Sequence, residues 1–373
     1  MSGVSDKDRL YKLFSQLVSI DSPSLGERQM ADRIKAELLS LGFEVYEDNA
    51  GEAIGGNAGN VYALLKGTDP SRESLLFSSH LDTVSPALGK QAVLHPDGRI
   101  TSRGDTVLGA DDAAGLVGIL EGVRKAISSG KPYGDIEVLC PVAEEIYTKG
   151  SKLFDLSRIR SKTAYVLDMS GDVGSAAIKA PSIISFKAEV RGRASHSGFA
   201  PENGINALAA AAAAIASVPQ GRTDPETTFN IGTLASGEAS NIVPERCVLT
   251  GEARGFDHAK ALDAVKDFES RLKEEAARIG AKVGFETRVE VKAYSVDENE
   301  AVVKRFLEAA KRTGLEGKTV STHGGSDNHT LNAGGISGIV LSCGMYSVHS
   351  VSEYTKLSEL EKSAALVREL ILA

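Results

Sequence analysis

Short apolar segments alternate with amphipathic helical segments in the first half of this 373-residue chain, and this alternation limits the folds available to it. The clearest apolar segments are residues 61–65, 75–77, 136–140 and 164–167. Each is short and nearly continuously apolar, so we predict strands that are buried on both faces. Apolar residues at helical spacing predict the connecting helices, one of which we expect to open at Ser24 and Glu27. Strands and helices in alternation are typical of an α/β sandwich with a mostly parallel sheet.

The pattern changes near residue 180. Residues 181–292 predict the order β-α-β-β-α-β, which is that of a ferredoxin-like α+β unit large enough to form a separate domain. The predicted elements are residues 183–190, 206–218, 227–234, 246–253, 258–279 and 283–291. A chain of 373 residues is also long for a single core. We therefore predict one domain made of residues 1–180 and 293–373, with residues 181–292 inserted as a second domain.

The composition argues against several classes of partner. The chain has 42 basic and 50 acidic residues, a formal net charge of −8 and no basic cluster, which argues against binding nucleic acid. No apolar run approaches the roughly 18 residues of a membrane span. The first residues lack the apolar core of a signal peptide, and 3 scattered cysteines do not predict a disulfide framework. We expect a cytoplasmic protein without a membrane or nucleic-acid partner.

His80 and Asp82 follow the strand predicted at residues 75–77. In an extended chain, residues two apart point to the same face. An imidazole at His80 could therefore bind a metal ion while the Asp82 carboxylate fixes its tautomer and raises its basicity, as carboxylates usually do for ligand histidines. The pair is a weak signal by itself, because the same spacing also occurs by chance and in ordinary loops.

Further residues with metal-binding side chains follow the predicted strands, and ligands in open α/β sheets collect beyond the carboxyl ends of strands. The candidates are His80, Asp111, Glu145, Asp168 and His349. Two histidines and three carboxylates suit two zinc or similar divalent ions, with one carboxylate bridging. Glu144 is informative because adjacent carboxylates repel unless a cation binds one of them, which leaves the other free for proton transfer. Each residue alone would more often be an ordinary surface group, but their joint occurrence favours a metal site.

Several motifs occur in a fixed order along nearly the whole chain. They are Ser79–Thr83, Leu108–Gly115, Ala143–Ile146, Val166–Asp168, Ala194–Gly198, Pro201–Ala207, Gly324–Asp327 and Val348–Ser350. These motifs resemble those of the M20 family of metallopeptidases, and within it the peptidase T-like aminopeptidases. The resemblance implies a zinc-peptidase-like α/β sandwich in which residues 181–292 form a lid and dimerisation domain.

The resemblance also implies a ligand set for two metal ions per chain. His80, Asp111 and Asp168 would bind one ion. Asp111, Glu145 and His349 would bind the other, with Zn²⁺ expected and Co²⁺ or Mn²⁺ as alternatives. An aspartate at position 168, where many members have glutamate, favours the peptidase T and dipeptidase side of the family over the glutamate-type carboxypeptidases.

The same resemblance assigns roles to the remaining candidates. Asp82 is implied as the partner that orients His80, and Glu144 as the general base. His196 resembles the inserted-domain histidine that helps to hold the scissile carbonyl, often from the neighbouring subunit of a dimer. Arg254 lies where members use an arginine to bind a substrate carboxylate.

Two further details follow from the resemblance. It suggests a cis peptide bond between Asp111 and Asp112. Tyr147, which follows the pair of glutamates, stands where a glycine is common, so the length of the substrate stays open.

The expected function is that of a di-metal aminopeptidase that releases the N-terminal residue of short peptides, tripeptides in particular, and acts as a homodimer through the inserted domain. An M20-type dipeptidase and an N-acyl amino acid deacylase are the alternatives within the same chemistry. A non-haem iron oxygenase would need only two histidines and one carboxylate, so the extra carboxylates argue against it. The remaining class is a non-catalytic metal- and peptide-binding protein on the same fold. Retention of Glu144 and of every ligand type argues against that class.

Overall fold

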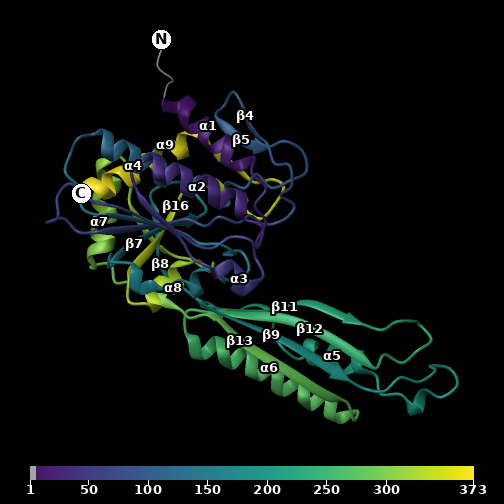
Figure 1. Cartoon of the computed structure of the whole chain (residues 1–373). Helices are drawn as coiled ribbons and strands as arrows, with labels where there is room; N and C mark the ends of the chain where they lie inside the picture. The colour runs from purple at the N-terminus through teal and green to yellow at the C-terminus, as the bar shows by residue number, and fades with distance from the viewer. Residues whose placement is uncertain (1–5) are drawn as a thin grey trace. The chain divides into compact units, whose positions relative to one another are not determined.

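The computed structural model describes residues 6–373 (Figure 1). The chain divides into two compact units. The first unit contains the chain up to Ile178 together with Ser295–Ser321 and Gly325–Ala373. The second unit contains Lys179–Tyr294 and Thr322–Gly324. None of the described helices is long and apolar enough to cross a membrane.

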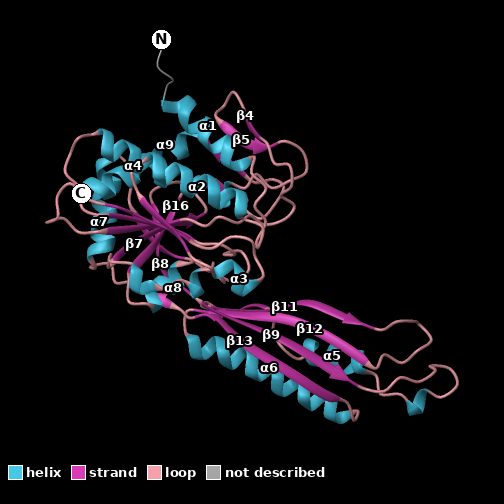
Figure 2. Cartoon of the chain, in the orientation of Figure 1, coloured by secondary structure: helices cyan, strands magenta, loops and turns pink. Residues whose placement is uncertain are grey.

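The main sheet, whose strands are magenta among the cyan helices of the first unit in Figure 2, is mixed, and its centre is parallel. In order across the sheet, the strands are β1 (Glu44–Glu47), β2 (Val61–Leu65), β6 (Ile136–Cys140), β3 (Leu75–Ser78), β7 (Thr163–Met169), β16 (Ser337–Ser342), β8 (Ser175–Ala180) and β14 (Tyr294–Ser295), with β15 (Lys318–Ser321) paired to β8. β3 runs parallel to β6 and β7, and β16 runs parallel to β7. β1, β2 and β8 form antiparallel pairs. The predicted α/β fold with a mostly parallel central sheet is therefore confirmed, with antiparallel strands at its flanks.

Helices pack against this sheet and against one another. Those of the first unit are α1 (Asp6–Val18), α2 (Arg28–Ser40), α3 (Ala50–Ile54), α4 (Ala110–Ser128), α7 (Ala301–Arg312), α8 (Asn328–Ala333) and α9 (Leu357–Leu372). α4 is almost wholly buried and packs against α1, α9 and β7. Gly122 lets α4 and α9 approach closely, because a Cβ atom there would lie 2.5 Å from Val367. The backbone at Asp111 and Asp112, at the N-terminal end of α4, is not helical and forms a kink.

A second, smaller sheet in the first unit joins segments that are far apart in the chain. Its strands are β17 (Met345–Tyr346), β18 (Tyr354–Lys356), β5 (Arg99–Ser102) and β4 (Ala92–Leu94). The polar sequence of residues 84–107 does not predict strands, and we expected none there. The pairing of β18 with β5 brings the loop that carries His349 next to this otherwise irregular region.

The second unit is an antiparallel sheet with two helices. The strand order is β10 (Gly221–Asp224), β11 (Thr227–Ser236), β12 (Arg246–Gly255), β9 (Ser182–Arg191) and β13 (Lys282–Val291), and the helices are α5 (Ala207–Ala216) and α6 (His258–Arg278). Without β10, the elements follow the predicted order β-α-β-β-α-β. The ferredoxin-like prediction is therefore confirmed, with one short strand added at the edge.

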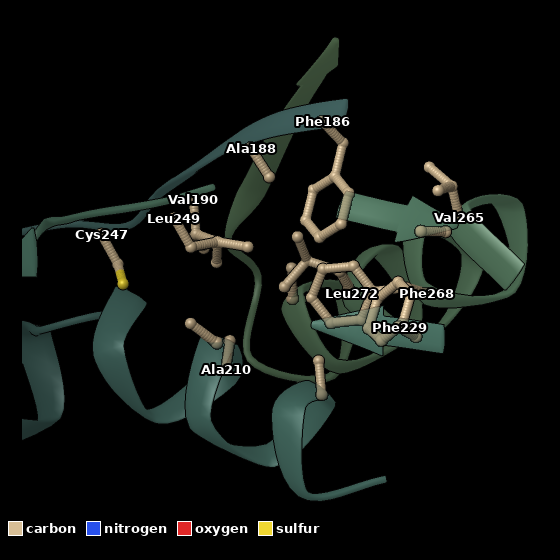
Figure 3. Packing of buried hydrophobic residues seen from close by; sticks show 14 of the residues in the cluster. Phe186, Ala188, Val190, Ala210, Phe229, Cys247, Leu249, Val265, Phe268 and Leu272 are labelled. Carbon is tan, nitrogen blue, oxygen red and sulfur yellow. The ribbon is translucent and has the colours of Figure 1, made fainter. Parts of the chain in front are cut away.

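Aromatic side chains fill the space between the sheet and the helices of the second unit (Figure 3). Phe186 of β9 stacks on Phe229 of β11, with ring centroids 5.6 Å apart, and contacts Phe268 of α6 at 5.3 Å. Gly251 makes room for Phe186, because a Cβ atom at Gly251 would lie 2.4 Å from the phenyl ring. The alanines of α5 contribute small side chains to this core. The second unit thus has a hydrophobic core of its own.

Candidate active site and metal centre

His80 lies between carboxylates, two residues beyond the end of β3. Its Nε2 atom is 3.1 Å from Asp111 Oδ1 and 3.8 Å from Asp168 Oδ1. Its Nδ1 atom is 3.0 Å from the backbone carbonyl oxygen of Asp82 and 3.4 Å from the carboxylate of the same residue. One ring nitrogen thus faces potential ligands while the other faces Asp82, the arrangement expected from their spacing.

The five candidate ligands form two groups that share one residue. The ligand atoms of His80, Asp111 and Asp168 lie within 4.8 Å of one another, and so do those of Asp111, Glu145 and His349. His349 Nε2 is 3.2 Å from Asp111 Oδ2 and 2.9 Å from Glu145 Oε2. Each oxygen of Asp111 therefore faces a different histidine, as a bridging carboxylate would.

Negative charge is concentrated among these side chains. Burial raises the pKa of Asp168 well above its usual range and also raises the pKa of Glu145. Hydrogen bonds to Asp111 and Glu145 raise the pKa of His349 to about 10. Glu145 Oε1 is buried and has no hydrogen-bond partner in the described chain. Buried carboxylates without partners are costly unless a cation neutralises them. The mixture of imidazole nitrogens and carboxylate oxygens fits divalent ions of the zinc, cobalt or manganese type.

Glu144, next to Glu145, is buried and belongs to the same group of charges. Burial, with additional repulsion from Asp327 and Glu145, raises the pKa of the Glu144 carboxyl well above its usual range. A carboxylate with a raised pKa is suited to accept a proton near neutral pH and to return it.

Known proteins match this chain over nearly its full length. The model of the M20 peptidase dimerisation domain matches residues 178–280, and that of peptidase family M28 matches residues 60–225. The crystal structure of aminopeptidase PepT from Bacillus cereus is 34% identical, covers 99% of both chains and has a TM-score of 0.89. That of a tripeptidase from Staphylococcus aureus is 32% identical over 99% of both chains, with a TM-score of 0.94.

A curated relative agrees with these structures. Peptidase T from Serratia proteamaculans is 26% identical, over 97% of this chain and 98% of the relative. The full-length matches decide between the two family names. This chain is an M20 metallopeptidase. Within the M20 family, it is peptidase T-like.

Asp82 of this M20 peptidase holds the backbone of both glutamates. Its two carboxylate oxygens accept hydrogen bonds from the backbone N–H of Glu144 at 2.9 Å and of Glu145 at 3.2 Å. The Ser24 hydroxyl donates to the same carboxylate at 2.6 Å. Asp82 therefore connects His80 to the glutamate pair, a function that its proximity to His80 in sequence did not reveal.

The helix that we expected to open at Ser24 and Glu27 is present, but it starts later than Ser24, with Glu27 as its N-cap residue. α2 begins at Arg28 without a side-chain cap, because both side chains are engaged elsewhere. Ser24 bonds to Asp82, and the buried Glu27 carboxylate accepts a hydrogen bond from the backbone N–H of Ala143 at 3.0 Å. Ala143 has a φ of +54°, a conformation that costs free energy for a residue with a side chain. Glu27 thus helps to hold a strained turn directly before Glu144.

Tyr147 departs from the M20 pattern, in which a glycine is common at this position, and the backbone conformation explains why glycine suits it. Its φ of +71° lies in the left-handed region that glycine adopts without steric cost. A glycine would therefore fit the same turn. Tyr147 keeps the turn and adds an exposed aromatic side chain two residues after Glu145.

Glu353 is a buried residue of the site that the sequence did not reveal. Its carboxylate accepts hydrogen bonds from the backbone N–H of Gly109 at 2.7 Å and of Asp111 at 2.9 Å. It thereby connects the loop of His349 to the first turn of α4. The predicted cis peptide bond between Asp111 and Asp112 is present in this turn. The only local signal for Glu353 was its position four residues after His349.

Replacing Glu353 with glutamine should weaken binding of the ion assigned to Asp111 and His349 by about 10- to 100-fold, the usual effect of losing a group that orients ligands. A glutamine amide would place its NH₂ group against one of the two backbone N–H donors, so one of the two hydrogen bonds that hold this turn would be lost. Competition with a chromophoric chelator measures the dissociation constant. Glu137→Gln is the matched control, because the buried Glu137 carboxylate also accepts hydrogen bonds from backbone N–H groups. Glu137 lies at the N-terminal end of β6, whereas the glutamate pair follows the C-terminal end of that strand. An equal loss of metal affinity in both variants would show a general packing defect instead.

His196 and Arg254 lie in the second unit of this M20 peptidase, so they do not belong to the ligand groups. His196 follows β9, and its Nδ1 atom accepts hydrogen bonds from the backbone N–H groups of Gly198 and Phe199, both at 3.1 Å. Arg254 of β12 donates to Glu252 at 2.7 Å and to the carbonyl oxygen of His323 at 2.9 Å. A substrate carboxylate would therefore have to share the Arg254 guanidinium with Glu252.

Proposed function

We propose that this protein is a di-metal aminopeptidase that removes the N-terminal residue of short peptides, tripeptides among them. The observation that carries the proposal is the sharing of Asp111 between two ligand groups, with the buried Glu144 beside them. The solved relatives, an aminopeptidase PepT and a tripeptidase, support this substrate class. We propose Zn²⁺ as the ion, with Co²⁺ or Mn²⁺ as alternatives.

The proposed reaction assigns one task to each residue. The ions that the two ligand groups would hold would lower the pKa of a water molecule to about 7 and polarise the substrate carbonyl. Glu144 accepts the proton of the attacking water and returns it to the leaving amine. His196 donates a hydrogen bond to the carbonyl oxygen as negative charge develops on it. Arg254 binds the C-terminal carboxylate of the substrate. Asp82 holds His80 and the backbone of Glu144 and Glu145 in position.

The test is to incubate metal-loaded protein with a free dipeptide, with a free tripeptide, and with the N-acetylated and C-amidated forms of the tripeptide. The free tripeptide should be cut at its first bond, and the amidated form at the same bond but more slowly, because Arg254 loses its partner. The N-acetylated form should resist. Cleavage of the acetyl group alone would favour the deacylase, and cleavage restricted to dipeptides would favour the dipeptidase. Metal-loaded protein that binds peptides without cutting them would favour the non-catalytic class.

We also propose that residues 181–292 form the dimer interface and that residues 1–180 and 293–373 form the catalytic domain. The match of a peptidase dimerisation domain to residues 178–280 supports this division. Light scattering of the purified protein should give the mass of a dimer. A fully active monomer would mean that His196 acts within its own chain. Location in the cytoplasm stays a prediction from the sequence.

A further inference from the structure

Phe199 carries the most exposed large apolar side chain of the described residues, with 87% of its surface accessible. It lies in the loop between β9 and α5, and its ring centroid is 4.3 Å from that of His196. Ile242, which is 41% exposed, forms an isolated antiparallel bridge with His196. Exposed apolar residues are ordinary when they occur singly. Phe199 and Ile242 instead both adjoin His196, one by ring contact and one by backbone pairing.

Hydrogen bonds fix both the loop and the tautomer of its histidine. The backbone N–H of Ala200 donates to the carbonyl oxygen of His196 at 3.1 Å. Gly198 and Phe199 donate their backbone N–H groups to His196 Nδ1. A ring nitrogen that accepts two hydrogen bonds carries no proton, so the neutral imidazole holds its proton on Nε2. His196 Nε2 is thus a hydrogen-bond donor, and Phe199 is held against the ring that carries it.

We propose that Phe199 and Ile242 form an apolar subsite for a substrate side chain next to the scissile bond, so that peptides with an apolar residue there are preferred substrates. The inference rests on the proposed function, in which His196 donates to the scissile carbonyl. Consecutive Cα atoms are about 3.8 Å apart, so both residues that flank the carbonyl lie within a side-chain length of the imidazole. Phe199 contacts that imidazole and is therefore within reach of a side chain next to the carbonyl.

Burial of an apolar substrate side chain on this surface gives the physical basis of the preference. Contact removes apolar surface of both Phe199 and the substrate from water, and the favourable free energy grows with the area removed. A serine or glycine at the same substrate position has little apolar surface to bury. Small differences in apolar size typically change kcat/KM by about 10-fold or more in hydrophobic pockets.

The experiment compares the metal-loaded parent protein with Phe199→Ala, Phe199→Leu and a control, Val289→Ala. Val289 is also an exposed apolar residue of the second unit, 43% accessible, and it pairs with Ile184 at the end of β9 far from His196. The substrates are the tripeptides Leu-Gly-Gly and Gly-Leu-Gly with their serine counterparts, Ser-Gly-Gly and Gly-Ser-Gly. The quantity compared is the ratio of kcat/KM for leucine over serine at each position.

The parent should prefer leucine by about 10-fold at one of the two positions. Phe199→Ala should reduce that ratio to about 3-fold or less while the serine peptides are cut at nearly the parental rate. Phe199→Leu should keep most of the preference, and Val289→Ala should keep all of it. A purely structural role of Phe199 would lower kcat/KM for leucine and serine peptides together.

Two results would overturn the inference while the proposed function stands. The first is a parent that cuts leucine and serine peptides equally well at both positions. The second is a Phe199→Ala variant whose preference equals that of the parent, or whose losses are the same for every peptide. If the parent cuts no free tripeptide at all, the proposed function fails, and the subsite fails with it.

Discussion

Replacing Glu144 with glutamine should lower the turnover number by about 10²-fold or more and leave the metal content unchanged. Glutamine keeps the shape of the side chain but cannot accept the proton of the attacking water. The hydrogen bond to Asp82 comes from the backbone N–H of Glu144 and does not involve the Glu144 side chain, so the turn should persist in the variant. KM should change little, because glutamine keeps the shape of the side chain and the turn that carries it. Steady-state kinetics and elemental analysis of identically loaded samples measure the two quantities.

Glu145→Ala is the matched comparison, since Glu145 is adjacent in sequence and equally held by Asp82. Glu145 belongs to the ligand group of Asp111 and His349, so its loss should weaken binding of one ion, and excess metal should restore part of the activity. Near-normal turnover in Glu144→Gln would contradict the assignment of the general base. Loss of an ion from Glu144→Gln but not from Glu145→Ala would show that the two roles are reversed.

Removing the ions with a chelator should reduce peptide hydrolysis to background, and restoring two divalent ions per chain should return it. The physical reason is that an attacking water and a polarised carbonyl both depend on the positive charge of the ions. The two groups of candidate ligands that share Asp111 provide histidine and carboxylate ligands for two such charges. Activity is measured while Zn²⁺, Co²⁺ or Mn²⁺ is titrated into the metal-free protein, with the bound ions counted by elemental analysis.

The shape of the titration separates one-ion from two-ion schemes. Activity that rises mainly with the second ion would support the bridging role of Asp111. One tightly bound ion with full activity would contradict the two-metal scheme. Asp111→Asn supplies a second measurement, because the loss of a shared carboxylate should weaken both sites, whereas Asp168→Asn should weaken only the site with His80.

The sequence predicted most of the fold because its signals are local. Apolar runs such as residues 61–65 and 136–140 begin and end where the strands do, since a strand buried on both faces cannot continue into polar residues. The order of elements in the second unit also followed from local periodicity. The strands within residues 84–107 were not predicted, because β4 and β5 are short and half-exposed and β5 pairs with β18, which is far away in the sequence.

The sequence by itself determined the kinds of residue at the candidate site, because metal-binding side chains stand out against apolar runs. Only the tertiary structure decided how those residues are held. Glu353 bonds to Asp111 across 242 positions of the chain, and Glu27 bonds to Ala143 across 116. Such bonds depend on loops that packed helices and paired strands bring together, and a carboxylate in a polar loop shows no sign of its distant partner. The tertiary structure likewise gave Asp82 its hold on Glu144, which spacing along one strand could not predict.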